Sequence, residues 1–353
     1  MNPNTLDLML ADMAKAPELF RPTLFWSNAM KPILADLKRH GVTQFRSHMS
    51  ALDMYVPTYI KREYLLNREA TDQAIQQLAA SNPDLARLFL GHLNGSVEAK
   101  RDWEIFCAAD SHQPPAFDQV FESAAGCPVE QHHFSGKSFG FAMLRYLKCL
   151  AFLKKHVDTK PITNVLEIGG GFGSLGEIFL RSHSKKYFYL NIDIPPTAYI
   201  SSWYLETLFG PNAVATYDQT RDQGTIDIEW LRANEFRAAV ICPWQLPKVK
   251  GNFQLFANSS SFQEMEPEVV ANYAKHLDGL VSHYLLLKNS RHGKPSAQSE
   301  TDVGVKQQTT RDHYIQYFSG FDVVALNADI FGETTEQGFE SEVMVFRRKG
   351  LAP

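Results

Sequence analysis

A cluster of glycines between a short apolar run and a helical run restricts the fold of this chain more than any other segment. Residues 164–168, Asn-Val-Leu-Glu-Ile, have the length and composition of a buried strand, and apolar residues recur at helical spacing over 175–179. Glycines allow the backbone to turn sharply from strand to helix and to approach a ligand closely, while the first free N–H groups of the helix point toward the same place. The segment therefore predicts the strand–loop–helix unit of an α/β sheet, with a small polar ligand at the loop.

Further strand candidates follow this unit, and helical segments lie between most of them. They cover residues 187–192, 238–241, 253–257, 283–287, 321–326 and 343–346. Strands that alternate with helices predict a doubly wound, mostly parallel sheet that is covered on both faces. The stretch between residues 326 and 343 has no helical period, so we expect the last two strands to form an antiparallel hairpin that closes the sheet.

The 353 residues divide by periodicity into two regions. Up to about residue 155 the apolar spacing is helical, with Asn82-Pro83 marking one helix start, and we expect residues 1–155 to form a helical N-terminal cap that binds the acceptor. Residues 156–353 are expected to form the cofactor-binding sheet domain, with residues 210–236 as an insertion that fits no simple crossover.

Charge and composition narrow the range of partners. Lys and Arg number 35 against 39 Asp and Glu, so the net charge of −4 provides no positive field for nucleic acid or anionic membranes. No run approaches the ~20 apolar residues that a membrane-spanning helix needs, and the first residues lack the pattern of a secretory signal. The four cysteines form no C-x-x-C motif, and no metal-ligand spacing is recognisable. We therefore expect a cytoplasmic protein with a small-molecule partner, with homo-oligomerisation left open.

Two ligand classes compete for the glycine loop. Residues 171–176, Gly-Phe-Gly-Ser-Leu-Gly, match G-x-G-x-x-G, the dinucleotide fingerprint, which on its own is a weak signal. Glu167, Gly169, Gly171 and Gly173 give the longer pattern E-x-G-x-G-x-G, with a carboxylate at the end of the strand. A carboxylate there repels the pyrophosphate of a dinucleotide and attracts the cationic amino group of a methionine moiety. The electrostatics favour S-adenosylmethionine over NAD.

The second strand supplies a carboxylate suited to a ribose. Asp193 follows residues 187–192 and lies 20 residues after Gly173, where its carboxylate can accept hydrogen bonds from both ribose hydroxyls. This spacing suits either cofactor, so it supports a nucleoside ligand without choosing between them. The alternative is an aspartate that caps the turn before Pro195.

These features together resemble the class I S-adenosylmethionine-dependent methyltransferases, and the glycine pattern is similar to their first motif. The chain is more specifically similar to a bacterial family of sugar O-methyltransferases, over residues 20–347. The segments that carry this likeness are residues 126–128, 166–173, 191–195 and 258–265. The resemblance implies a seven-stranded sheet with a helical region over its ligand edge, S-adenosylmethionine as cofactor and a sugar or glycoside as acceptor. Ile194 stands where the family tends to have leucine, so the identity of the acceptor is what the resemblance predicts least well.

A base near the acceptor hydroxyl assists the in-line displacement of a methyl group from a sulfonium. Glu264 follows the strand at 253–257, at the carboxyl edge where α/β sheets place their sites, and is the first candidate. The alternative is that Ser261 and Glu264 form an S-x-x-E capping box at the start of the next helix. His292 lies beyond the following strand and His133 before a predicted helix, and each is either a base or a solvated or structural histidine.

Two further residues are expected beside the cofactor. Asn258 follows the fourth major strand, where its amide suits the base of the cleft, and Trp244 follows the third, where it is either a flank for adenine or a core residue. The leading hypothesis is transfer of a methyl group from S-adenosylmethionine to a sugar hydroxyl in glycan or natural-product biosynthesis. The alternatives are a methyltransferase for a non-sugar small molecule, an NAD-dependent oxidoreductase and a non-catalytic nucleoside-binding scaffold.

Overall fold

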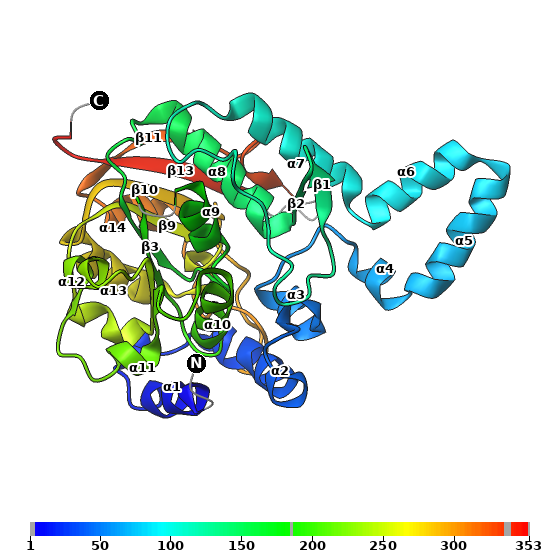
Figure 1. Cartoon of the computed structure of the whole chain (residues 1–353). Coiled ribbons are helices and arrows are strands. Elements are labelled where there is room, and N and C mark those ends of the chain that lie inside the picture. The colour runs from blue at the N-terminus through cyan, green and yellow to red at the C-terminus, as the bar shows by residue number, and fades with distance from the viewer. Residues whose placement is uncertain (1–3, 184–185, 335–339, 352–353) are drawn as a thin grey trace.

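A mixed sheet of nine strands forms the centre of the computed structural model, which describes residues 4–183, 186–334 and 340–351 (Figure 1). The strands are β3 (Asn164–Ile168), β4 (Phe188–Ile192), β5 (Val214–Ala215), β7 (Ala238–Ile241), β9 (Phe253–Ser259), β10 (Val281–Ser290), β11 (Phe321–Asn327), β12 (Glu333–Thr334) and β13 (Glu340–Arg348). Their order is β11-β13-β10-β9-β3-β4-β7-β5, with β12 beside β13. All pairs from β10 to β5 are parallel, whereas β13 runs antiparallel to β10, β11 and β12.

The sheet differs in detail from the expected one of seven strands. The short strand β5 extends it beyond β7, and the short strand β12 is added beside β13. β13 lies between β10 and β11 and is antiparallel to both. The burial patterns account for this order, because β13 is almost continuously buried whereas β11 exposes much of its length, as an edge strand does.

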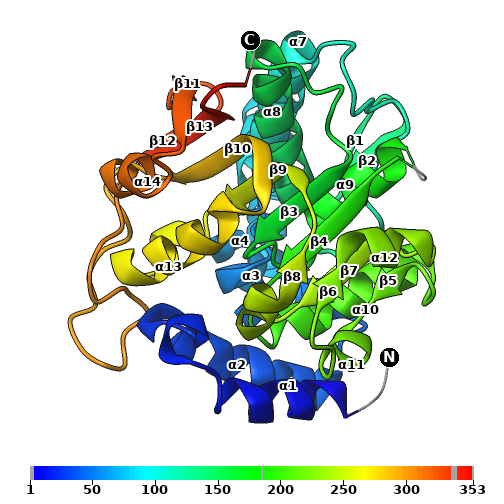
Figure 2. The ribbon, with the colours of Figure 1, turned by 90° about the vertical axis from the view of Figure 1, so that its left-hand side faces the viewer.

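Helices cover both faces of the sheet (Figure 2). They are α8 (Phe141–His156), α9 (Ser174–Ser182) and α10 (Thr197–Phe209) on one face, and α12 (Ile228–Ala233), α13 (Pro267–Asp278) and α14 (Arg311–Tyr317) on the other. Successive residues of a strand point to opposite faces, so each central strand supplies two cores. In β3, Val165 belongs to the core under α8 and α9, whereas Leu166 and Ile168 belong to the core under α13.

The segment expected as an insertion, residues 210–236, carries short elements. They are β5, α11 (Tyr217–Thr220), β6 (Ile226–Asp227) and α12, and β6 pairs in parallel with β8 (Val249–Lys250). Three-residue and six-residue 3-10 helices occupy other connections, namely Glu18–Phe20, Phe45–Ser47, Pro243–Lys248 and Phe262–Glu264.

The chain before α8 is mainly helical. Its elements are α1 (Thr5–Met13), α2 (Leu24–His40), α3 (Met49–Met54), α4 (Arg62–Leu66), α5 (Arg68–Ser81), α6 (Pro83–Leu93), α7 (Ser96–Ala109) and the hairpin of β1 (His132–Phe134) and β2 (Lys137–Phe139). Met9, Ile33 and Phe45 from this region are buried in the same core as Val165 of the sheet. None of the helices in the described residues is long and apolar enough to cross a bilayer.

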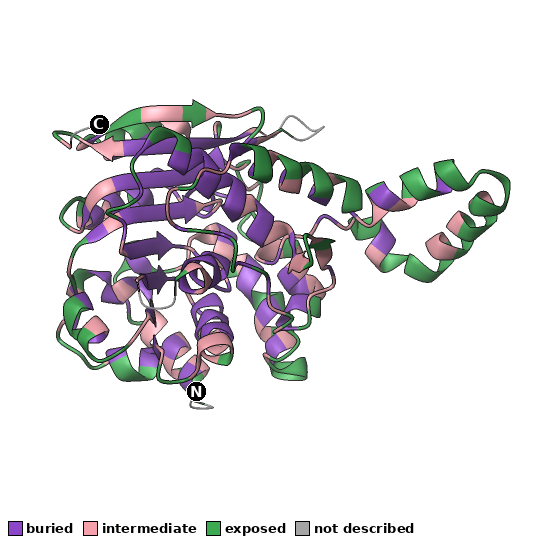
Figure 3. Ribbon diagram, turned by 45° about the horizontal axis from the view of Figure 1, so that its top comes forward, coloured by how far each residue is buried: buried purple, intermediate pink, exposed green. Residues whose placement is uncertain are grey.

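Helices α5 and α6 form an arm that projects from the body of the molecule (Figures 1 and 3). No residue of α5 is buried, and in α6 only Ala86 and Gly91 are buried. The helix start predicted at Asn82-Pro83 is confirmed, because the Asn82 side chain accepts a hydrogen bond from the Leu85 N–H and Pro83 is the first helical residue.

The direction of chain progression through the sheet reverses at β3. From β3 the chain continues to β4 and β7 on one side, whereas β9 and β10 lie on the other side. Such a reversal leaves a crevice outside the carboxyl ends of the two neighbouring strands. Asn258 of β9 joins these strands, since its Nδ2 donates to the carbonyl oxygen of Ile168 over 2.8 Å.

Candidate functional site

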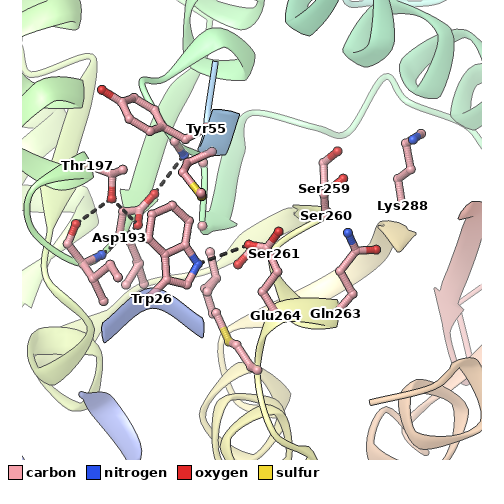
Figure 4. A pocket seen from close by; sticks show the side chains of 18 of the residues that line it. Trp26, Tyr55, Asp193, Thr197, Ser259, Ser260, Ser261, Gln263, Glu264 and Lys288 are labelled. Atoms are coloured by element: carbon pink, nitrogen blue, oxygen red, sulfur yellow. Dashed lines mark hydrogen bonds between the residues drawn. The ribbon is translucent and has the colours of Figure 1, made fainter. Parts of the chain in front are cut away.

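A cavity of about 290 Å³ lies at this strand reversal (Figure 4). Its walls come from the loop after β3, the end of β4, the segment after β9 and the N-terminal helical region. The N-terminal region contributes Trp26 of α2 and Tyr55 after α3, so aromatic side chains face the carboxyl edge of the sheet. The two regions of the chain therefore enclose one cavity together.

The glycine loop forms one wall with backbone alone. Gly169 (φ +71°) and Gly171 (φ +56°) line the cavity in the left-handed region, where other residues are strained. A Cβ on Gly169 would overlap the Ser261 side chain, whereas a Cβ on Gly171 would meet the Tyr55 carbonyl oxygen at 3.7 Å. Gly173 (φ +99°) lies behind the lining, at the N-cap of α9. The loop brings backbone close to the space that a ligand occupies.

Asp193 lies at the end of β4 with its carboxylate at the cavity. Its Oδ2 accepts from the Gly171 N–H over 2.8 Å, and its Oδ1 accepts from the Ile194 N–H and the Thr197 hydroxyl. The turn alternative from the sequence is realised, because Asp193 holds the turn into α10, and the same residue also lines the cavity. Burial raises the pKa of Asp193 to about 7, against the opposing effect of these hydrogen bonds.

Glu167 does not line the cavity. It is fully buried beneath the loop, where Oε1 accepts from the Tyr146 hydroxyl over 2.7 Å and Oε2 accepts from the Tyr189 hydroxyl over 2.5 Å. Burial raises its pKa to about 7. Tyr146 does line the cavity, so Glu167 acts on the site by holding that tyrosine and the loop.

Ser174 begins α9 directly after the glycine loop and lines the cavity. Its side chain is buried, and its Oγ has no hydrogen-bond partner among the described residues. A buried hydroxyl without a partner costs about 1–3 kcal/mol unless a ligand or water satisfies it. The helix N-terminus beside it offers further N–H donors, so the position suits an anionic or hydroxyl-bearing part of a ligand.

Glu264 reaches the cavity from the segment after β9. Its Oε2 accepts from Trp26 Nε1 over 3.1 Å, and its Oε1 lies 3.8 Å from Lys294 Nζ. Burial raises the pKa of the carboxyl to about 7, a value suited to accepting a proton near neutral pH. The capping box with Ser261 is not formed, because residues 262–264 are a 3-10 helix without a side-chain cap and α13 begins at Pro267.

Four other predicted residues lie outside the cavity lining. The His292 side chain is 71% exposed, and His133 is exposed on β1, where its Nε2 lies 3.3 Å from Ser138 Oγ. Trp244 points to Tyr217, whose hydroxyl accepts from its Nε1 over 3.2 Å, while the neighbouring Pro243 lines the cavity. Asn258 is buried behind the wall, in the strand contact described above.

The sequence did not identify three charged residues at the opposite end of the cavity. Arg145 of α8 and Lys288 of β10 both face Glu333 of β12, at 2.9 Å and 3.5 Å. Lys288 is buried, and this burial together with the neighbouring Arg145 lowers its pKa to about 8. The available signal for Lys288 was its place directly after the apolar run of residues 284–287.

The fold and the cavity together define an α/β protein with a cavity at its strand reversal, where proteins of this architecture place their ligands. No family model matches this chain, and no curated protein sequence matches it. Among the described residues, no three or more His, Cys, Asp and Glu side chains gather as metal ligands would.

Several solved structures of methyltransferases are similar to this chain. The mitomycin 7-O-methyltransferase MmcR has 11% identity and a TM-score of 0.37 over 99% of this chain and 73% of its own. Magnesium protoporphyrin IX methyltransferase from Synechocystis PCC 6803 with bound SAM has 10% identity and a TM-score of 0.38, over 59% of this chain and 79% of its own. A SAM-dependent methyltransferase from Leishmania major has 12% identity and a TM-score of 0.39, over 58% and 72%. These values are too low to identify the family or the substrate of this chain.

Proposed function

We propose that the protein transfers a methyl group from S-adenosylmethionine to a hydroxyl of a sugar or glycoside. The observation that carries the proposal is the meeting of the glycine loop, Asp193 and Glu264 around one cavity at the strand reversal. Backbone donors, a ribose-binding carboxylate and a candidate base are the groups that such a reaction uses. The E-x-G-x-G-x-G pattern over residues 167–173 still resembles the first motif of S-adenosylmethionine-dependent methyltransferases, but Glu167 lies beneath the loop and its charge does not select the donor.

The residues present fit the methyl donor. Asp193 would accept hydrogen bonds from the ribose hydroxyls, and Ser174 with the N-terminus of α9 would donate to a polar end of the ligand. Tyr146, held by Glu167, would border the same space. Bound S-adenosylmethionine supplies a methyl group on a positively charged sulfur, which is already activated for displacement.

The protein's own contribution is to position the acceptor and to accept its proton. Glu264 is the proposed base, because it combines a place in the wall with a pKa of about 7. Trp26 donates to one of its oxygens and so orients the carboxylate. Residues 1–155 are proposed as the acceptor-binding cap, and residues 156–353 as the donor-binding domain. The side chains of Trp26 and Tyr55, which line the cavity at the sheet edge, would exclude water from the reacting atoms.

Calorimetry with S-adenosylhomocysteine and with NAD tests the choice of donor. We expect S-adenosylhomocysteine to bind and NAD not to bind, whereas NAD binding without S-adenosylhomocysteine binding would refute the proposal. Gly171→Asp is expected to abolish binding with the fold retained, because its carboxylate would enter the cavity beside Asp193. The matched control is Gly136→Asp, at a glycine that also has a positive φ (+76°) but has open space around its Cβ position and does not line the cavity.

A further inference from the structure

A second cavity of about 620 Å³ adjoins the first. It lies between α7, α8 and the β12 segment, and Asp193 is not part of its lining. Arg145, Lys288 and Glu333 line both cavities, so they form the boundary between them. The first cavity, where the methyl donor is proposed to bind, is called the donor cavity below. A ligand in the second cavity therefore reaches the donor cavity past these three side chains.

Positive charge exceeds negative charge at this boundary. Arg145 and Lys288 share the single carboxylate of Glu333, and Lys288 Nζ otherwise donates to the Ser341 hydroxyl over 3.1 Å. The Lys288 side chain is only 3% exposed, so water screens its charge poorly. A buried lysine and a partly buried arginine on one carboxylate leave one positive charge to be matched by an anion.

Among the described residues, the other carboxylates of the second cavity have partners of their own or lie in solvent. Asp102 pairs with Lys148 over 2.8 Å and accepts from the Tyr59 hydroxyl, Glu98 lies 3.0 Å from His92 Nδ1, and Asp329 is exposed. Tyr59 also packs against Phe141, with ring centroids 4.7 Å apart, and both rings line the cavity. An aromatic wall beside ionic and hydroxyl groups suits a sugar ring that carries many hydroxyls.

We propose that the second cavity holds the body of the acceptor, and that this acceptor is a sugar bearing a carboxylate or phosphate group that pairs with Lys288 and Arg145. The inference rests on the proposed function and adds the substrate class to it. Charge-assisted hydrogen bonds from a lysine and an arginine recognise both kinds of anion. The acceptor hydroxyl then lies on the donor-cavity side of the boundary, where Glu264 is the proposed base.

Calorimetry on the full chain saturated with S-adenosylhomocysteine tests this inference. The probes are glucuronate for a carboxylate, glucose 6-phosphate for a phosphate, and glucose as the neutral reference. We expect at least one anionic probe to bind about tenfold or more tightly than glucose, and the preferred probe identifies the anion. Equal affinity for all three, or binding of none, would overturn the inference while leaving donor binding intact. Failure of S-adenosylhomocysteine itself to bind would instead overturn the proposed function.

Two variants separate the boundary from the donor site. Lys288→Gln is expected to weaken the anionic probe about tenfold or more and to change S-adenosylhomocysteine affinity by less than about twofold. Lys38→Gln, at an exposed lysine of α2 that lines neither cavity, is the control. Weakened S-adenosylhomocysteine binding with unchanged probe binding would assign Lys288 to the donor and refute the inference.

A cavity-filling variant tests the second cavity without altering charge. Ile105 of α7 lines the second cavity and not the first, so Ile105→Trp is expected to abolish probe binding while S-adenosylhomocysteine still binds. Retained S-adenosylhomocysteine binding also reports that this variant is folded. Ile315→Trp, at an exposed position of α14, is the matched control. Unchanged probe binding in Ile105→Trp would place the acceptor elsewhere.

Discussion

Two carboxyl groups of the donor cavity, those of Asp193 and Glu264, have the same pKa of about 7 for the same reason, which is burial. Their partners nevertheless suit them to different work. Asp193 accepts from two backbone N–H groups and a hydroxyl, which fix its position. Glu264 accepts from Trp26, faces Lys294 Nζ at 3.8 Å and keeps capacity for a further donor. Both groups change charge near neutral pH, so each predicts a pH dependence of its own.

Donor binding is expected to weaken as the pH falls through about 7. The ionised Asp193 accepts from ribose hydroxyls better than the protonated form, and the protonated form dominates below the pKa. Calorimetry between about pH 8 and pH 6 should therefore report up to about a tenfold loss of S-adenosylhomocysteine affinity. Asp193→Asn should bind weakly with little of this dependence, and Asp322→Asn, at an exposed residue of β11, should behave as the wild type. A pH dependence unchanged in Asp193→Asn would contradict the assignment.

Methyl transfer is expected to rise with pH through about 7, because Glu264 accepts a proton only when it is ionised. Glu264→Gln should lower kcat by about 10²- to 10⁴-fold, with S-adenosylhomocysteine affinity nearly unchanged. Product detection by mass spectrometry across pH, with the acceptor identified above, provides the measurement. Glu268→Gln on α13 is a matched exposed control. Wild-type activity in Glu264→Gln would exclude this residue as the base.

At the scale of elements, the contact between β3 and β9 fixes the position of two walls of the cavity relative to each other. Asn258 donates to the Ile168 carbonyl, and its Oδ1 accepts from the Phe262 N–H and from Asn289 Nδ2. One buried amide therefore joins three strands, β3, β9 and β10, and the segment that carries Glu264. Asn258 lies behind the cavity wall and does not line it, so it supports the site structurally.

Asn258→Ala is expected to lower the free energy of unfolding by about 2–5 kcal/mol, because it leaves buried groups of three residues without their partner. Urea denaturation measures the change. Asn234→Ala, at an exposed asparagine after α12, should stay within about 0.5 kcal/mol of the wild type. If Asn258→Ala also lowered the free energy of unfolding by no more than about 0.5 kcal/mol, the contact would not stabilise the strand reversal.

The sequence was most informative where chemistry follows a strand directly. Glycines 169 and 171, Asp193 and Glu264 each come just after an apolar run, so the rule that parallel strands end at one edge was enough to bring them together. Arg145, Lys288 and Glu333 escaped prediction because α8, β10 and β12 meet only through the order of the folded sheet. Glu167 fits the motif, yet the tyrosines that cover it come from α8 and β4, which local spacing cannot reveal.

At the scale of the whole molecule, the helical region divides into a part that shares the core of the sheet and a part that does not. Met9 and Ile33 are buried with sheet residues, and Asp12 of α1 pairs with Arg221 after α11 over 2.6 Å. The arm of α5 and α6 instead exposes apolar side chains, including Leu88 at 54% and Phe89 at 51%. The arm therefore depends less on the sheet for its stability than the rest of the helical region does.

Removal of the arm is expected to leave the rest of the fold intact. Replacing residues 68–90 with a Gly/Ser linker of about eight residues should lower Tm by no more than a few degrees, because α5 buries none of its residues. Thermal denaturation and S-adenosylhomocysteine calorimetry measure the two outcomes. Unfolding of this variant would show that the arm stabilises the body in a way that burial does not reveal.

The position of β13 has a consequence for synthesis. This strand begins at Glu340, after both β10 and β11 along the chain, yet it lies between them in the sheet. A nascent chain on the ribosome therefore exposes the unpaired edge of β10 until β13 has been synthesised, and unpaired edges associate with one another. Expression of this protein should accordingly tolerate an extension after β13 but not a stop codon before it, which would leave an aggregating fragment.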